Sequence, residues 1–376
     1  MLSRMIPALL VLVCATANAQ TAVCPALEKG NDIPHESGIV STWKYRAADG
    51  RWALIIGQDM RVNADGAPAA YAVRGQHGMS YLCDGALVSV DRGPFSTKNK
   101  ESCGAAVAEI DNIPIVDGSI EFPTGMKHRL CIFGFEVTGG KSCNDGQAVL
   151  VGDDKPARAQ IHRNVLDARG NGMEHFLSTT SLKHKDGRSL DSSTLPFVVA
   201  PRGIADMTKG QFGFVVSNGA TNLDGAMPAS RAIPVVVGDT GPADKFGEGS
   251  IAAHQFLAYG ELRDGPRFDP LVCQGKATDQ CNAANLPYVL TKSFPYPYQD
   301  KEGGDVRPKR NWPGKLLYVF FPVQEADRPS EYTFRLVGGN AEGSIAEGAR
   351  KVASSFGGID KIVECIRLQK KVGGFQ

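Results

Sequence analysis

Two acidic residues lie nine positions apart in a glycine-rich stretch in the second half of the chain. Residues 233–251 read IPVVVGDTGPADKFGEGSI and contain Asp239 and Glu248. Glycines flank both acids, so the backbone can turn tightly there and leave each carboxylate accessible. Two carboxylates presented from one segment can serve as acid and base in glycoside hydrolysis. The alternative interpretation is structural: an aspartate in a turn and a glutamate close to a helix N-terminus.

Two elements must hold these acids in place. The apolar run 233–237 predicts a buried strand that ends in a turn at residues 238–242. Residues 251–257 predict an amphipathic helix, and the preceding 247–249 predicts a bend into that helix, a better fit than an N-cap at Ser250.

The rest of the chain predicts a fold made mainly of β-strands. The sequence holds 43 glycines and 22 prolines, which separate short apolar runs and favour short strands over long helices. We expect a barrel-like, mostly antiparallel core with a few short helices. The Asp-Thr-Gly-Pro turn after a buried strand is similar to double-psi barrels, so that barrel type is one form the core could take. Strand candidates are residues 40–45, 52–56, 87–90, 195–201, 212–216 and 316–322; residues 345–356 predict a helix, and 359–368 a final helix or strand.

The N-terminus predicts an exported protein. Arg4, the apolar run 5–15 and the small residues 17–19 form the pattern of a secretory signal peptide, with the mature chain beginning at Gln20. No later apolar stretch is long enough to span a bilayer. We therefore expect residues 1–19 to be a signal peptide, residues 20–376 to form the mature protein, and the protein to be secreted or periplasmic.

Cysteine usage agrees with export. Nine cysteines are present and Cys14 lies in the signal peptide, which leaves an even number and indicates disulfide bonds. Cys273 and Cys281 are close enough in sequence to close a small loop together. Three cysteines fall within residues 92–145, which we interpret as a disulfide-bearing insertion in the mature domain.

Composition removes several classes of function. Loss of the signal peptide removes Arg4 and no acid, which leaves 40 basic and 40 acidic residues, so nucleic acid is not an expected partner. No CxxC pair or histidine cluster predicts a metal site, and no phosphate-binding glycine motif predicts a nucleotide. We expect no cofactor.

Four stretches, in order, resemble the fungal-type chitosanases of glycoside hydrolase family 75. They are DMRVNADGAPAAY at 59–71, FLSTTSL at 176–182, LPFVVAP at 195–201 and VGDTGPADKFGEGSI at 237–251. The first is similar to a D-x-x-I-D-A-D-G-A-P-x-A-Y motif, with Asn63 where the family commonly has aspartate. The fourth is similar to the family's G-D-T-G-P…G-E-A-S-I catalytic motif and is the most specific of the four. The matches cover roughly residues 59–257.

The resemblance implies an endo-acting hydrolase that cleaves β-1,4 linkages in chitosan with inversion. The positions that match its two essential carboxylates are Asp239, expected as general base, and Glu248, expected as general acid. Asp59, Asp65 and Thr240 are the expected substrate-binding residues. In this mechanism, the carboxyl groups stand roughly 6.5–9.5 Å apart to admit a water molecule.

The substrate remains open at the level of sequence. Chitosan is a polycation and favours an acidic groove, yet the mature chain is neutral and places Lys245 between the two acids. A cell-wall lytic enzyme acting on peptidoglycan is therefore a second hypothesis. A non-catalytic carbohydrate-binding envelope protein is the third.

Overall fold

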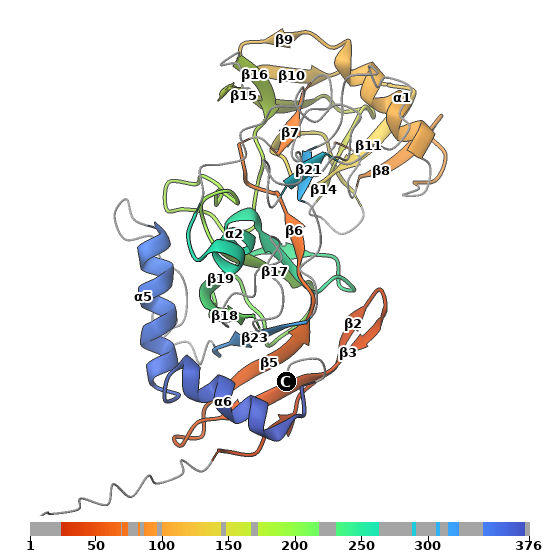
Figure 1. Ribbon diagram of the computed structural model, residues 1–376. Coiled ribbons are helices and arrows are strands. Elements are labelled where there is room, and N and C mark those ends of the chain that lie inside the picture. The colour runs from red at the N-terminus through yellow and green to blue at the C-terminus, as the bar shows by residue number, and fades with distance from the viewer. Residues whose placement is uncertain are drawn as a thin grey trace, which may run out of the picture.

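The computed structural model describes residues 24–68, 70–73, 82, 86–95, 100–143, 148–166, 172–217, 231–262, 288–290, 306–308, 315–322 and 341–372. The predicted signal peptide and the predicted Cys273–Cys281 pair lie outside these residues. The described chain is mainly β, as expected, and forms a strand-rich body below a second lobe in Figure 1. Among the described helices, none is both long and apolar enough to cross a membrane.

The body is built on one nine-stranded sheet. Every neighbouring pair in it is antiparallel except β17 with β19 and β20 with β6, which are parallel. In spatial order its strands are β1 (Glu28–Lys29), β4 (Thr42–Arg46), β5 (Trp52–Gln58), β23 (Leu316–Phe320), β18 (Phe212–Val216), β19 (Ala232–Gly241), β17 (Phe197–Pro201), β20 (Glu248–Ser250) and β6 (Arg61–Asn63).

Chain connectivity requires this sheet to curl. Only Asp59 and Met60 separate β5 from β6, so the two strand ends lie within about 11 Å of each other. In the sheet order, however, five strands stand between them, which in a flat sheet would put them roughly 29 Å apart. The sheet therefore rolls into a barrel-like core, as the sequence predicted; the double-psi arrangement stays a prediction.

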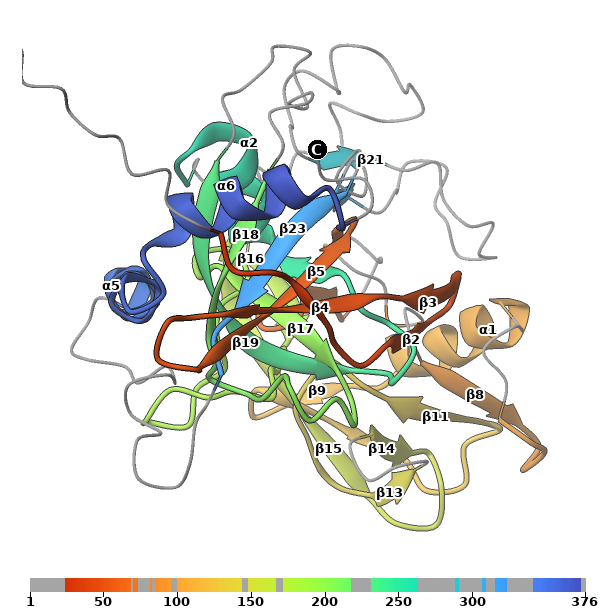
Figure 2. The same ribbon diagram turned by 90° about the horizontal axis from the view of Figure 1, so that it is seen from below.

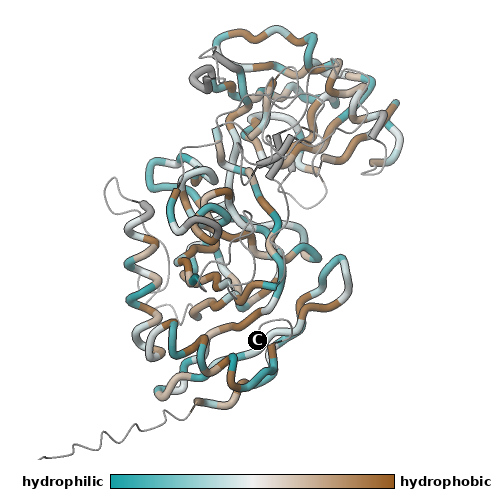
Figure 3. The backbone as a smooth tube through the Cα atoms, in the orientation of Figure 1, coloured by the Kyte–Doolittle hydropathy of each residue, from teal (hydrophilic) through white to brown (hydrophobic). Residues whose placement is uncertain are grey.

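Successive side chains along the strands point to opposite faces of the sheet and form two apolar layers. One side of the sheet packs together as the barrel interior: Leu54, Ile56, Val198, Val215, Val235, Val237, Tyr318 and Phe320 are all buried there. The intervening residues of the same strands, including Ile55, Phe214 and Val319, pack on the outside. Figure 3 shows the corresponding run of hydrophobic colour along these strands.

Two C-terminal helices cover the outer layer. They are α5 (Ala341–Ser354) and α6 (Ile359–Gln369); Ile345 on α5, Ile366 on α6 and Phe356 in the link between them pack against the outer side of the sheet. Figure 2 shows both helices along the flank of the barrel strands. The segment predicted as helix or strand is thus a helix.

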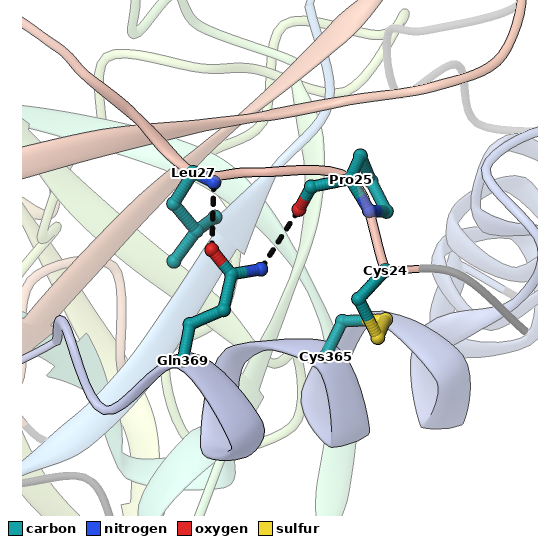
Figure 4. The surroundings of a disulfide bond; sticks show 5 residues. All are labelled: Cys24, Pro25, Leu27, Cys365 and Gln369. Carbon is teal, nitrogen blue, oxygen red and sulfur yellow. Dashed lines mark hydrogen bonds between the residues drawn. A yellow bond between two sulfur atoms is a disulfide. The ribbon is translucent and has the colours of Figure 1, made fainter. Parts of the chain in front are cut away.

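A disulfide joins the two ends of the described chain. Cys24 bonds to Cys365 on α6 across 341 positions of sequence. Beside it, the Gln369 side chain accepts a hydrogen bond from the Leu27 amide and donates one to the Pro25 carbonyl, each 2.8 Å long (Figure 4). The N-terminal segment is therefore fastened to the last helix.

The described part of the second lobe contains two smaller sheets and one helix. The first sheet comprises β7 (Tyr71–Ala72), β16 (Gly172–Phe176), β15 (Ala157–Leu166), β10 (Ser119–Phe122) and β9 (Ile115–Val116), with β12 (Val137–Gly139) also paired to β15. The second comprises β13 (Lys141–Cys143), β14 (Ala148–Val151), β11 (His128–Ile132) and β8 (Leu87–Val90). Helix α1 (Lys100–Asp111) packs on β8 and β11. Two hairpins, β2 (Ile33–His35)–β3 (Gly38–Val40) and β21 (Tyr288–Leu290)–β22 (Val306–Pro308), each form a separate two-stranded sheet.

This lobe extends past the boundaries of the predicted insertion at 92–145. Strand β11 pairs with β8 before it, and β10 pairs with β15 after it. The predicted disulfides are present: Cys131 bonds to Cys143, and Cys103 is also disulfide-bonded. The lobe spans the chain from β7 to β16, so its strands enclose the predicted insertion.

Candidate functional site

Asp239 lies on a strand, and the turn predicted at 238–242 is wrong in that respect. Strand β19 continues to Gly241 because its parallel partner β17 keeps pairing with it: Ala200 lies opposite Thr240 and Pro201 opposite Gly241. The register slips by one residue at Gly238, since Val198 pairs with Val237 and Val199 with Asp239. A Cβ at position 238 would lie 2.6 Å from the Phe197 side chain, so the bulge requires glycine.

Glu248 lies on the other side of the same β17 residue. It opens β20, which pairs antiparallel with β17 and places Glu248 opposite Val199. Residues opposite one another in a sheet project from the same face. Asp239 and Glu248 therefore share one face of the barrel wall, with buried Val199 between them and two strand spacings, about 10 Å, between their Cα atoms.

The helix after Glu248 begins with a cap that the sequence reasoning rejected. Ser250 is the N-cap of α2 (Ile251–Tyr259), and its hydroxyl oxygen accepts a 3.1 Å hydrogen bond from the Ala253 amide. The same hydroxyl donates to the Leu195 carbonyl and accepts from the Phe197 amide. Because Ser250 caps the helix and bonds to the start of β17 at once, it fixes Glu248 two residues earlier.

The Asp239 carboxylate is buried and held through one oxygen. Oδ1 accepts hydrogen bonds from the Ser181 amide at 2.9 Å, the Ser181 hydroxyl at 2.5 Å and the Thr240 amide at 2.8 Å. Burial raises the pKa of Asp239 above its ordinary value, while these hydrogen bonds and the charge of Lys183 act in the opposite direction. The group is thus a carboxylate with fixed orientation in a poorly hydrated place.

Ser181 is the centre of this arrangement. Its hydroxyl lies 2.7 Å from the Thr240 hydroxyl, and the Thr240 amide also approaches it at 3.2 Å. Two residues on, the Lys183 ammonium donates to the hydroxyls of Thr179 and Ser189. This hydroxyl-rich segment, between β16 and β17, therefore brings both a donor and a positive charge to Asp239.

Asp65 belongs to the same electrostatic cluster. It follows β6, which in Figure 1 rises from the barrel toward the second lobe. The charges of Asp239 and Glu248 both act on it, and with burial of its carboxyl group as the largest cause they raise the pKa of Asp65 to about 7. The three carboxyl groups hence lie within electrostatic reach of one another.

The link that carries Asp65 has a fixed conformation. The Tyr71 hydroxyl donates to Asp65 Oδ1, and the Asp65 amide donates to Asn63 Oδ1 at 3.0 Å. Gly66 follows with φ +87°, and a Cβ there would lie 1.9 Å from the Leu190 carbonyl oxygen, so no other residue fits. Asn63, the position that departs from the family motif, pairs with Ser250 across β6 and β20.

The other two predicted substrate-binding residues, Thr240 and Asp59, lie in different parts of the structure. Thr240 is partly buried and its hydroxyl bonds to Ser181, which makes it a support for Asp239. Asp59 lies at the start of the link between β5 and β6, where its carbonyl accepts a hydrogen bond from the Tyr318 hydroxyl at 3.0 Å. Burial raises the pKa of Tyr318, and the Asp59 charge adds to that effect. In the described interactions Asp59 contacts Tyr318 and none of the three clustered carboxyl groups.

Three residues of the site had no assigned role in the sequence reasoning. Ser181 and Lys183 follow the FLSTT run, and the run of hydroxyls was the signal available. Tyr71 closes the DGAPAAY stretch. Lys183, and not Lys245, is the cation that acts on Asp239 in the described interactions.

The described residues of this site offer groups suited to acid–base chemistry. Among the described residues, no group of three or more histidine, cysteine, aspartate or glutamate side chains converges closely enough to hold a metal ion. The sequence matches no protein-family model and no curated protein. The likeness to the chitosanase family accordingly rests on the four short stretches.

Proposed function

We propose that this protein is an exported endo-acting glycoside hydrolase that cleaves a polymer of amino sugars with inversion. The observation that supports it best is the placement of Asp239 and Glu248 on one face, on either side of Val199. Their Cα atoms lie two strand spacings apart, about 10 Å, and this spacing leaves room for the carboxyl separation of roughly 6.5–9.5 Å that inverting enzymes use. The ordered match of four stretches to the chitosanase family adds to this geometry.

In this mechanism Asp239 is the general base. The Ser181 and Thr240 donors hold its Oδ1, which orients the carboxylate toward a water molecule on one face of the sugar. Glu248, which is partly exposed, is the general acid that protonates the leaving oxygen from the other side. Val199 gives the space between the two groups an apolar floor.

Chitosan is the first candidate substrate because the site gathers three carboxyl groups, Asp65, Asp239 and Glu248. Peptidoglycan is the second, and a specific observation favours it: the charge of Lys183 acts on Asp239, and a cation beside the base disfavours an ammonium-bearing sugar there. The disulfides Cys24–Cys365 and Cys131–Cys143 are compatible with an extracellular or periplasmic enzyme that could meet either polymer.

The test is release of reducing ends from chitosan and from peptidoglycan by the mature protein. We expect Asp239→Asn and Glu248→Gln each to lower kcat at least 100-fold, and Asp117→Asn to leave it unchanged. Asp117 is a matched control because it is exposed in the turn between β9 and β10 with φ +47°, a conformation that asparagine adopts readily.

Two further measurements assign the roles. Azide should restore activity to Asp239→Asn, because it replaces the water that the missing base would activate; rescue of Glu248→Gln instead would reverse the assignment. The first-formed product should have the inverted anomeric configuration by NMR. If neither polymer is cut, the enzyme proposal fails, and binding of the intact polymers would then favour the non-catalytic envelope protein.

A further inference from the structure

We propose that Arg61 is a specificity-determining residue of this site, which binds a carboxylate on the leaving side of the polymer when the bond is cut. The inference rests on the proposed function and deepens it, because it names the substrate class. That class is an amino-sugar polymer that carries carboxylates, as peptidoglycan does and chitosan does not. The inference starts from the row of side chains, on four neighbouring strands, to which Arg61 belongs.

Arg61 lies in the same row of the sheet as the two acids. Glu248 on β20 pairs in parallel with Arg61 on β6. On its other side Glu248 is opposite Val199, and Val199 is opposite Asp239. Side chains opposite one another project from the same face, and neighbouring strands are about 4.8 Å apart. This face therefore presents, in order, the base, an apolar residue, the acid and a guanidinium.

The segment before Glu248 is fastened to the strand that carries Arg61. The Arg61 amide donates to the Gly247 carbonyl at 2.7 Å. Gly247 has φ +98°, and a Cβ there would lie 2.6 Å from the Asp59 carbonyl oxygen, so only glycine lets the segment pass this close to the link between β5 and β6. The backbone therefore holds Arg61 next to Glu248, whatever the Arg61 side chain contacts.

The Arg61 guanidinium lies at the surface and already binds one carboxylate. Its side chain is 36% exposed, and its Nη2 pairs with Oε1 of Glu36, in the turn of the hairpin β2–β3, which projects from the barrel body in Figure 1. The Glu36 amide donates to the Asp244 carbonyl at 2.9 Å. Gln58 Nε2 lies 3.0 Å from His35 Nε2. These contacts hold the hairpin beside the end of the row that carries the acid.

A guanidinium in this position suits a carboxylate on the substrate. Arginine is always charged and offers its N–H donors in a planar fork that can bind a carboxylate through two parallel hydrogen bonds. Among the described residues, Glu36 is the one side-chain partner of Arg61 and takes one of its three nitrogens. The other donors can therefore meet a second carboxylate.

The order of the row places that carboxylate on the leaving side. In the inverting mechanism the base and the acid act from opposite sides of the attacked sugar, and the acid protonates the oxygen of the leaving sugar. Arg61 lies beyond the acid Glu248 as seen from the base Asp239. It therefore lies beside the sugar that leaves.

A second cation lies at the other end of the row. Lys183 is exposed and follows, two residues on, Ser181, whose hydroxyl donates to Asp239. Each of the two acids is thus accompanied by a cation. A polymer of ammonium-bearing sugars would meet positive charge at both ends of the row, whereas a polymer with N-acetylated sugars and carboxylates would not be repelled.

The test compares one glycan in two chemical forms. Peptidoglycan strands freed of their peptides carry a lactyl carboxylate on alternate sugars, and amidation of these carboxylates removes only the charge. One hydrogen bond to a charged group corresponds to about 10–100-fold in kcat/KM, so the natural protein should cut the carboxylate form faster by that factor. Arg61→Gln should lose this factor on the carboxylate form, mainly through a higher KM. Its activity on the amidated form should be unchanged, which also shows that the variant is folded.

Glu36→Gln is the matched control, because it breaks the same ion pair and keeps the guanidinium. We expect its activity to stay within about threefold of the natural protein on both forms, since exposed ion pairs contribute little to stability. If Arg61 only fastened the hairpin, Arg61→Gln and Glu36→Gln would lower activity equally and on both forms, and that result would overturn the proposal. Arg61→Lys, which keeps the charge and loses the fork, should fall between the natural protein and Arg61→Gln.

A second control tests for unspecific attraction between a positive surface and an anionic polymer. Arg46 is also an exposed arginine paired with a glutamate, Glu28, but it lies opposite Trp52 at the start of β5. That position is roughly 20 Å along β5 from the link to β6. Arg46→Gln should cut both forms as the natural protein does. A loss equal to that of Arg61→Gln would overturn the proposal.

Intact peptidoglycan separates the two sources of the carboxylate. In the intact polymer the lactyl carboxyl group is amide-bonded to a peptide, and the free carboxylates belong to the peptides. Loss of activity in Arg61→Gln on the peptide-free strands assigns the contact to the sugar. Loss on the intact polymer alone assigns it to the peptide, and no loss on either overturns the proposal.

The proposed function and this inference can fail separately. If the natural protein cuts chitosan faster than every form of peptidoglycan, the proposed function stands and the inference is overturned. If no polymer is cut, the proposed function fails, and binding of the peptide-free strands decides the inference. Binding weakened at least about tenfold both by amidation and by Arg61→Gln would support the carboxylate contact, and equal binding would overturn it.

Discussion

Removal of the Ser181 hydroxyl should make Asp239 harder to ionise. In Ser181→Ala, Oδ1 keeps the two backbone donors, Ser181 N at 2.9 Å and Thr240 N at 2.8 Å, and loses the hydroxyl at 2.5 Å. A hydrogen bond to a charged group contributes about 1.5–3 kcal/mol. Since 1.36 kcal/mol corresponds to one pH unit, the pKa of Asp239 should rise by about 1–2 units.

The change should appear in two independent measurements. The acidic limb of the kcat/KM profile should move up by about 1–2 pH units, because the base must be ionised to act. In urea unfolding, burial already raises the folded-state pKa of Asp239, so its contribution to stability falls as pH rises above 3.8. The variant extends that fall to higher pH, so it should lose about 1.5–3 kcal/mol near neutral pH and little at low pH.

Ser193→Ala is the matched control. Its hydroxyl donates to the Asp191 carboxylate at 2.6 Å, which is the same chemistry outside the cluster of three carboxyl groups. We expect its acidic limb to be unmoved. The reasoning would be refuted if Ser181→Ala left the limb in place, or if its stability loss were equal at pH 3.5 and pH 7.

Three further predictions concern the scaffold. Burial lowers the pKa of His254 to about 4. The free energy of unfolding should therefore fall by about 3 kcal/mol as pH falls from 6.5 to 4. In urea unfolding, His254→Gln should remove this pH dependence. Replacing Cys24 and Cys365 by serine opens a loop of 341 positions and should lower stability by about 2–5 kcal/mol, or Tm by roughly 3–7 °C in calorimetry, whereas an unchanged Tm would contradict a stabilising bond. Gly66→Ala should cost more than about 2 kcal/mol, because its Cβ would lie 1.9 Å from the Leu190 carbonyl oxygen; a smaller loss in chemical denaturation would argue against that close approach.

Much of the fold followed from local pattern. The apolar runs at 52–56, 212–216 and 316–322 correspond to β5, β18 and β23, and the strand-rich, barrel-like core was expected from them. Such runs are recognisable in sequence because burial of alternate residues depends on neighbours along the chain. The even number of cysteines likewise indicated disulfides but could not pair Cys24 with Cys365 across the whole chain.

The segment 238–242 was predicted wrongly from the local sequence pattern. Residues 238–242 read as a turn because glycine and proline flank Asp239. In the fold, β17 lies beside this segment as a parallel partner, and the energy of continued pairing extends β19 through Thr240. The residues around Asp239 do not indicate that a strand distant in sequence will pair beside them in parallel. The sequence therefore could not place Asp239 on a strand.

By itself the sequence determined which residues could do acid–base chemistry, Asp239 and Glu248, and that they lie close along the chain. Only the tertiary structure decided that Val199 stands between them, that Ser181 holds the Asp239 carboxylate and that the charges of both acids act on Asp65. The physical reason is that side-chain type is a property of each residue, whereas separation, burial and mutual charge are set by strands and links that are distant in sequence and meet only when the sheet curls.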